Sequence, residues 1–233
     1  SKQDMSSADG GFGSRAQLCG STGKGFTGPV GSTRMRSTMT PPSGNTRRLH
    51  LPVPLVRQGN NCGCGLAAIC MVMDYHGIPV TVHDLERHKL VLPRMLHRDG
   101  IGPGRLGRIA LSYGCRVGIG DREARDVGQL CALEGGEWQA EPPAKRHIVE
   151  ALSAGNPVVA CIPDKTEAFE GCTHHGSHWI TIRGLDGEDP VIHDPAPWRK
   201  AERCKPGYWD RWECSMLVIG PPRGAGTASS AAS

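Results

Sequence analysis

The sequence of 233 residues lacks the marks of several large protein classes. It holds no run of 18 apolar residues, so its pattern predicts no transmembrane helix. No secretory signal is visible at the N-terminus, and no internal repeat occurs. These absences lead us to expect a protein without a membrane span, either cytoplasmic or secreted.

A strong excess of charge of one sign is also missing. The chain carries 27 Lys and Arg against 23 Asp and Glu, a formal net charge of +4. A charge of this size usually reflects solubility alone. Although residues 1–48 are distinctly basic, we therefore expect no nucleic-acid partner.

Aliphatic side chains are scarce at both ends of the sequence. Residues 1–48 are rich in Gly, Ser, Thr and Pro, and residues 221–233 have a similar composition. Such segments bury too little apolar surface to offset the entropy lost on ordering. We therefore predict disordered tails at 1–48 and 221–233, on either side of one domain at 49–220.

The ten cysteines are irregularly spaced, without the paired Cys-x-x-Cys spacing of structural zinc sites. The cluster Cys172-x-His-His-x-x-His178 is the best alternative for a metal, but its pattern is not that of a known structural site. We expect no metal and no cofactor. A reduced chain whose thiols mostly pack in the core is favoured over a secreted disulfide scaffold.

Predicted helices come mostly before predicted strands along the chain. The apolar patterns indicate helices at 65–75, 82–90, 106–113 and 144–154. They indicate strands at 116–118, 157–162, 178–183, 190–193 and 216–219. An Asp-Gly turn within 185–189 joins two of these strands as a hairpin. Segregated helices and strands favour an α+β fold.

Cys64 is a candidate nucleophile because it stands where the buried helix at 65–75 begins. The positive end of a helix dipole stabilises a thiolate. Gly63 and Gly65 allow a substrate to approach the backbone closely. A cysteine at a helix start is also often simply buried, so this position alone does not decide the role.

His178 and Asp194 are candidates for the partners of that thiol. His178 opens an apolar strand, and a side chain there projects rigidly from the edge of the sheet. Asp194 ends the strand that pairs with it through the Asp-Gly turn. A hairpin brings its open ends together, so the carboxylate can orient the imidazole and stabilise its cation.

The segment from Gln58 to Gly77 resembles the catalytic-cysteine block of the double-glycine leader peptidases, papain-like domains of bacterial bacteriocin exporters. In that family a Gln stands six residues before the catalytic Cys and a Gly thirteen residues after it, as Gln58 and Gly77 do around Cys64. The segment at 51–58 also resembles bacterial type III effector proteases. Where the family usually has Asp before the catalytic Cys, this chain has Gly63, with Cys62 one residue earlier.

A second block extends the resemblance over about residues 52–198. The family has a His that opens a strand and an Asp-Pro sixteen residues later, which His178 and Asp194-Pro195 match. Gly155-Asn-Pro-Val-Val resembles the turn and strand that precede that His. No ATPase segment of the exporters follows in this sequence.

The resemblance implies a papain-like fold, in which a central helix bearing the catalytic Cys packs on a C-terminal antiparallel sheet. It implies that Cys64 is the nucleophile, His178 the general base and acid, and Asp194 the group that orients His178. Gln58 would donate to the oxyanion together with the Cys64 backbone N–H. The expected activity is that of a cysteine peptidase acting through a thioester on a peptide or protein substrate, as a monomer.

Substrate recognition is expected near Gly63, Ser177 and Trp179, although Trp179 could also serve packing alone. The family cuts after Gly-Gly, and this chain carries that dipeptide at 10–11 and 135–136, which raises the hypothesis of self-cleavage near Gly11. Two alternatives stay open: an acyltransferase or deamidase of the effector or toxin type, and a non-catalytic peptide-binding module.

Overall fold

The computed structural model describes residues 48–121, 132, 134–139 and 142–222. All of them belong to one unit, Gly44–Ser233. The disorder predicted for the two tails falls almost entirely outside the described residues, as does the hypothesis of cleavage near Gly11. In the described part of the chain, no helix is long and apolar enough to cross a membrane.

The described residues form one mixed sheet of seven strands. The strands are β1 (Leu49–His50), β2 (Arg116–Gly120), β3 (Glu137–Gln139), β4 (Val158–Ile162), β5 (His178–Asp186), β6 (Asp189–His193) and β7 (Met216–Gly220). Their order is β1-β5-β4-β7-β2-β3, and β6 pairs with β5 as well. All pairs are antiparallel except β2 with β3.

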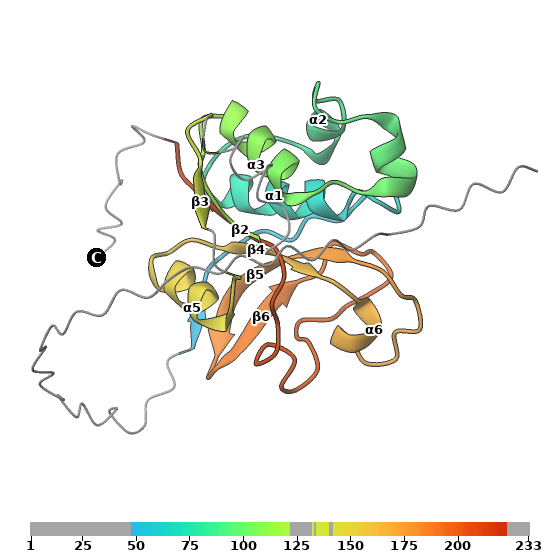
Figure 1. The fold of residues 1–233 in the computed structure, drawn as a ribbon, viewed down its shortest axis with the longest axis vertical. Coiled ribbons are helices and arrows are strands. Elements are labelled where there is room, and N and C mark those ends of the chain that lie inside the picture. The colour runs from blue at the N-terminus through green and yellow to red at the C-terminus, as the bar shows by residue number, and fades with distance from the viewer. Residues whose placement is uncertain (1–47, 122–131, 133, 140–141, 223–233) are drawn as a thin grey trace, which may run out of the picture. The chain divides into compact units, whose positions relative to one another are not determined.

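Helices lie on both faces of this sheet (Figure 1). They are α1 (Cys64–Tyr75), α2 (Val82–Glu86), the π-helix η1 (Met95–Asp99), α3 (Pro103–Ser112), α5 (Lys145–Ser153) and α6 (Lys165–Ala168). On one face α1 contacts β5 and α3 contacts β2, whereas α5 contacts β4 and β5 on the other (Figure 1). The predicted α+β class is confirmed, with the helix that begins at Cys64 packed on the C-terminal sheet.

The predicted helix at 82–90 is wrong in its second half. Its start is as expected, since Thr81 caps α2 and forms a reciprocal capping box with Asp84. The helix ends at Glu86, however, and the ring nitrogen Nδ1 of His88 accepts the Leu90 backbone N–H at 3.2 Å. That side-chain bond takes an N–H that a continuing helix would have used, so the chain turns instead. The short elements η1, α6 and β3 were not predicted.

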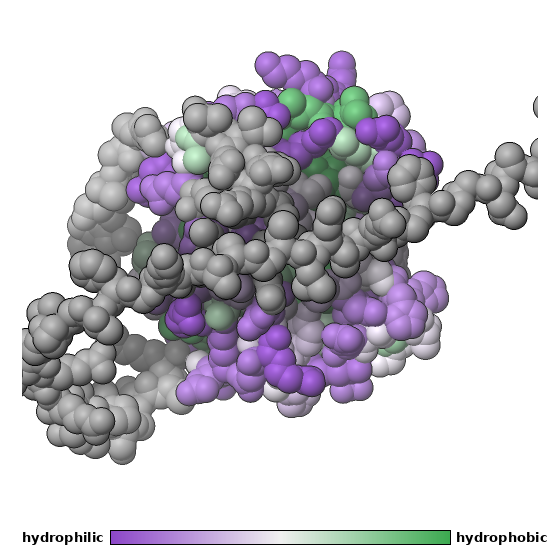
Figure 2. Space-filling view, in the orientation of Figure 1, coloured by the Kyte–Doolittle hydropathy of each residue, from purple (hydrophilic) through white to green (hydrophobic). Residues whose placement is uncertain are grey.

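Helix α1 forms the centre of the core. Ten of its twelve residues, from Cys64 to Met73, are buried. It lies close to β5 because Gly65 has no side chain: a Cβ there would lie 3.0 Å from Leu106 and 3.1 Å from Trp179. The surface around this core is mainly hydrophilic on the face seen in Figure 2, with apolar residues showing near α2 and α3.

The β5–β6 hairpin carries the predicted Asp-Gly turn, with Gly187 at a φ of 67°. The register shifts between Ile182 and Gly184, so Arg183 forms a bulge. Past this bulge Thr181 pairs with His193. The next residue, Asp194, therefore stands opposite Ile180, on the face that His178 also uses.

Candidate active site

Cys64 is the first residue of α1, and its side chain is buried with 9 % of the residue exposed. The N-cap residue Gly63 has no side chain that could bond the first-turn N–H groups. Those groups and the helix dipole consequently present positive charge at the point where the thiol lies. The position suits an anion, either the thiolate or a developing oxyanion.

The thiol of Cys64 interacts with the imidazole of His178, and each group shifts the pKa of the other. Burial raises the pKa of this thiol, but the hydrogen bond and charge of His178 and the backbone N–H groups of Trp179 and Gly65 outweigh it. The net result is a pKa below the ordinary thiol value. The surroundings of Cys64 therefore favour a thiolate.

His178 begins β5 and pairs with Asp194 just beyond β6. Its Nε2 lies 2.7 Å from Oδ1 of Asp194, and 5 % and 2 % of the two residues are exposed. Because Nε2 is engaged by the carboxylate, Nδ1 is the ring nitrogen that stays available to the Cys64 thiol. The structure thus brings the three predicted triad residues together in the order thiol, imidazole, carboxylate.

Opposing effects set the charges of the imidazole and the carboxylate. Burial lowers the pKa of His178, but its bonds to Asp194 and Cys64 raise it to a net value above the ordinary one. Burial raises the pKa of Asp194, but His178, the Ala196 N–H and Arg199 lower it overall. Together with the lowered pKa of Cys64, these directions favour a thiolate–imidazolium pair beside an ionised carboxylate.

Gln58 is buried beside the loop that leads to Cys64. Its backbone N–H donates to the Pro195 carbonyl at 2.9 Å. Its Nε2 donates to the Asn60 carbonyl at 2.8 Å and more weakly to Asn61 at 3.4 Å, while Oε1 is buried without a partner among the described residues. Gln58 therefore connects the loop before Cys64 to the segment after Asp194. That its side chain donates to the oxyanion stays a prediction.

The three residues predicted to bind substrate differ in accessibility. Gly63 is buried and Ser177 is exposed. Trp179 is 6 % exposed, and its indole N–H donates to the Ile101 carbonyl at 3.0 Å. The ring of Trp179 is thus held in the core, and this residue contacts the thiol through its backbone N–H.

The neighbouring thiol Cys62 lies in a different environment from Cys64. It is half-buried, and its backbone N–H donates to Oδ1 of Asn60 at 3.1 Å. The thiol that interacts with the imidazole of His178 is that of Cys64. This geometry favours Cys64 as the reactive thiol, as the spacing to Gln58 and Gly77 predicted.

A cavity of about 590 Å³ is lined by residues that neighbour the triad and not by the triad residues themselves. Asn61, three residues before Cys64, lines one part of it, and Arg199, which bonds Asp194, lines another. Trp198 also contributes to the wall and is 66 % exposed. The recess is open, partly aromatic and partly charged.

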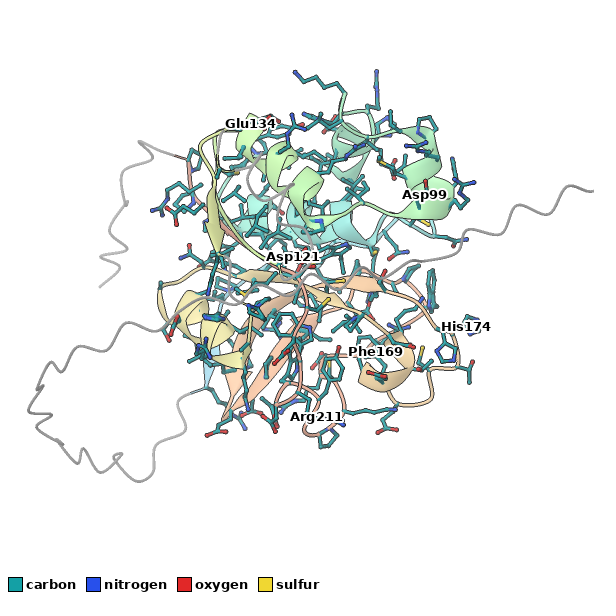
Figure 3. All side chains as sticks on the ribbon, viewed as in Figure 1. Asp99, Asp121, Glu134, Phe169, His174 and Arg211 are labelled. Carbon is teal, nitrogen blue, oxygen red and sulfur yellow. The ribbon has the colours of Figure 1, made fainter. Side chains whose placement is uncertain are left out.

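The candidate metal cluster at 172–178 is not assembled. His178 bonds Asp194, His175 pairs with Asp164 at 2.7 Å, and His174 lies at the outer edge of its loop (Figure 3). Across the described ranges, no group of three or more His, Cys, Asp or Glu side chains is placed to hold a metal ion.

Sequence reasoning missed two arginines at this site. Arg199 donates from Nη1 to Oδ2 of Asp194 at 2.9 Å. Arg57 donates from Nη1 to the carbonyls of Asp194 and Ala196, both at 2.8 Å. Neither arginine lies in a periodic pattern; the only signal was their closeness in sequence to Gln58 and Asp194.

Comparisons with known proteins gave matches to solved structures alone. No family model matches the chain, and no curated protein matches it. A protein from Bacillus anthracis described as a C39-like peptidase is similar, with 16 % identity, a TM-score of 0.49, and coverage of 76 % of this chain and 99 % of that one.

Two further solved structures are similar to the chain. One is a double glycine motif protease from an AMS/PCAT transporter in complex with the leader peptide: 18 % identity, TM-score 0.44, covering 74 % of this chain and 94 % of that one. The other is the peptidase domain of Streptococcus ComA, a bifunctional ABC transporter of a quorum-sensing pathway: 15 % identity, TM-score 0.42, covering 72 % and 97 %. These are the kinds of protein that the sequence resemblance named.

Proposed function

We propose that this protein is a cysteine peptidase whose nucleophile is Cys64. The observation that carries the proposal is the chain of contacts from the Cys64 thiol to His178 and on to Asp194, with 2.7 Å between the last two. The thiol lies at the start of a buried helix, and its pKa is lowered. A thiolate next to an oriented imidazolium is the arrangement that thioester chemistry requires.

The reaction proceeds in two acyl transfers. The Cys64 thiolate attacks the peptide carbonyl carbon, and the oxygen of the tetrahedral intermediate takes the negative charge. The imidazolium of His178 gives its proton to the leaving amine as the C–N bond breaks, which leaves a thioester on Cys64. Neutral His178 then removes a proton from water, and the hydroxide displaces the thiolate to release the acid.

The oxyanion is stabilised by the backbone N–H of Cys64 and by the side-chain amide of Gln58. Removing one such donor typically costs about 3 kcal/mol of transition-state stabilisation. For Gln58 to take this role, its Nε2 must turn one N–H from the Asn61 carbonyl, where the present bond of 3.4 Å is weak. The bond to Asn60 can be retained, because an amide nitrogen carries two hydrogens.

The substrate is a peptide or protein, cut after Gly-Gly or another small residue. The sequence resemblance to the double-glycine leader peptidases is the ground for this preference. Residues next to the scissile bond would occupy the cavity lined by Asn61 and Trp198. Self-cleavage near Gly11 belongs to the same proposal.

An acyltransferase or a deamidase is the alternative on the same constellation, since the thioester can also be resolved by an amine or formed from a side-chain amide. The acceptor decides between these reactions. A module that only binds peptides needs no lowered thiol pKa and no buried imidazole–carboxylate pair, so the contacts of Cys64 and His178 favour an enzyme.

Peptides with an internal Gly-Gly, incubated with wild type, Cys64→Ala and Cys62→Ala, test the proposal by mass spectrometry. We expect two shorter products from wild type and Cys62→Ala, and none from Cys64→Ala. A mass increase of one unit without cleavage would indicate a deamidase, and a product joined to an added amine would indicate a transferase. The intact masses of the three proteins report self-cleavage in the same experiment.

A further inference from the structure

Arg199 closes the triad on the side away from the nucleophile. Building on the proposed peptidase function, we propose that Arg199 is a positioning residue that fixes and charge-balances Asp194, so that His178 holds the Cys64 thiolate. No part of the sequence resemblance assigned this role. The proposal rests on the contacts of the guanidinium group, on the burial of the carboxylate and on the aromatic ring packed beside both.

Both oxygens of the Asp194 carboxylate are occupied. Oδ1 accepts from His178 Nε2 at 2.7 Å and from the Ala196 backbone N–H at 2.8 Å, whereas Oδ2 accepts from Arg199 Nη1 at 2.9 Å. The Asp194 side chain is 1 % exposed and that of Arg199 is 16 % exposed. Water therefore contributes little to solvating this carboxylate, and the arginine replaces it.

Phe169 holds the guanidinium group from a second side. The guanidinium carbon of Arg199 lies 4.3 Å from the centre of the Phe169 ring, and the same ring meets the His178 ring edge-on at 6.5 Å. Phe169 is the residue at the C-terminal end of α6 and is labelled in Figure 3. The contacts form a closed circuit from His178 through Asp194 and Arg199 to Phe169, so the carboxylate cannot rotate without breaking it.

The charges alternate along this chain of groups: thiolate, imidazolium, carboxylate, guanidinium. Without the guanidinium, the buried carboxylate keeps a single cationic partner, and its pKa rises. The Cys64 thiolate also loses a positive charge in its surroundings and the fixed orientation of His178. The pKa of Cys64 is therefore expected to rise when Arg199 is replaced.

Only arginine satisfies all of these contacts at once. Its planar group donates to Asp194 along one edge, presents its face to Phe169 and points Nη2 to the Cys172 sulfur at 3.5 Å. A lysine at this position would keep the charge but lose the flat stacking and the second donor. The lysine variant consequently separates the effect of charge from the effect of orientation.

The test compares wild type, Arg199→Met and Arg199→Lys with Arg203→Met, which removes a half-exposed arginine paired with Asp186. The first readout is the rate of Cys64 alkylation by iodoacetamide against pH, which needs no substrate. We expect its midpoint to move up by about 0.5 to 1 pH unit in Arg199→Met. In Arg199→Lys about half of that shift should remain, and Arg203→Met should match wild type.

The second readout is peptide cleavage. We expect kcat to fall about 10- to 100-fold in Arg199→Met, with KM changed less than about threefold, and an intermediate kcat in Arg199→Lys. Thermal melting identifies variants that do not fold, and Arg199→Lys then carries the comparison. An alkylation midpoint in a folded Arg199 variant equal to that of Arg203→Met overturns the proposal. If wild type cleaves no peptide while the midpoint still moves, the peptidase function fails and the positioning role stands.

Discussion

The backbone N–H of Gln58 donates to the carbonyl oxygen of Pro195 at 2.9 Å. This bond ties the loop that leads to the nucleophile to the segment that follows the triad carboxylate. Arg57 reinforces it from the adjacent position, since its Nη1 donates to the carbonyls of Asp194, Ala196 and Arg199. The loop before Cys64 and the segment after Asp194 are therefore joined by direct hydrogen bonds, in addition to the packing of α1 on β5.

Replacing Arg57 by Met should loosen this junction. The variant loses the two N–H donors of Nη1, which make the bonds of 2.8 Å to the carbonyls of Asp194 and Ala196, and we expect this loss to cost about 1–2 kcal/mol of unfolding free energy. We expect kcat to fall about tenfold because Asp194 and Gln58 lose their fixed separation. Denaturant unfolding and steady-state kinetics measure both effects. Arg211→Met, at an exposed arginine, is the control; equal behaviour of the two variants would show that the junction has no role.

The activity should depend on pH in a bell shape with its limbs set by Cys64 and His178. The pKa of Cys64 is lowered, which moves the acid limb to lower pH, and the pKa of His178 is raised, which moves the alkaline limb to higher pH. In Asp194→Asn, the negative charge that raises the pKa of His178 is gone. The alkaline limb of kcat/KM should therefore move to lower pH in that variant.

A pH profile of kcat/KM for wild type and Asp194→Asn checks this direction. Asp186→Asn serves as the control, because Asp186 pairs with exposed arginines at the far end of β5. An alkaline limb that stays in place in Asp194→Asn would mean that a group other than His178 sets it.

The cysteines should differ sharply in reactivity near pH 7. Burial raises the pKa of Cys70 and Cys115 to about 11 and that of Cys204 to about 12. The pKa of Cys214 is lowered by its interaction with the Cys161 thiol. Together with Cys64, Cys214 should therefore react first with iodoacetamide.

Peptide mapping after brief labelling gives the order of reaction. Labelling of Cys64 should disappear in His178→Ala at pH 7 while that of Cys214 persists, since only the first thiol depends on the imidazole. If Cys70 were labelled as fast as Cys64, the proposal of an activated thiolate would fail.

The sequence was sufficient to predict the parts of the site that depend on local spacing. The apolar run after Cys64 predicted α1, and the Asp-Gly turn predicted the hairpin that joins His178 to Asp194. The bulge at Arg183 was not predicted, although Gly184, a glycine inside the strand, is a signal for a bulge. Without this bulge, Asp194 would stand opposite Thr181, and its side chain would lie on the other side of the sheet from His178.

The supporting contacts of the site arise from long-range packing and had no sequence signal. Arg199 reaches Asp194 only because the segment after Pro195 turns back toward the sheet, and Phe169 meets it from the short helix α6. The early end of α2 depends on the His88 ring, which competes for a backbone N–H. Propensity reports the average behaviour of a residue type, whereas these outcomes depend on single side chains.

Gly65 sets the closeness of α1 to β5 and hence the distance from Cys64 to His178. In Gly65→Ala, the new methyl group would meet side-chain carbons of Leu106 and Trp179 at 3.0 and 3.1 Å, tighter than ordinary contact. We expect a loss of about 1–3 kcal/mol in unfolding free energy, as for other overpacked cores. We also expect a lower rate of Cys64 alkylation at pH 7, because the start of α1 moves away from His178.

Gly118→Ala is the matched control, since a Cβ at Gly118 in β2 meets no atom within 4 Å. An alkylation rate in Gly65→Ala equal to that in Gly118→Ala would show that the pairing of Cys64 with His178 does not depend on this close approach.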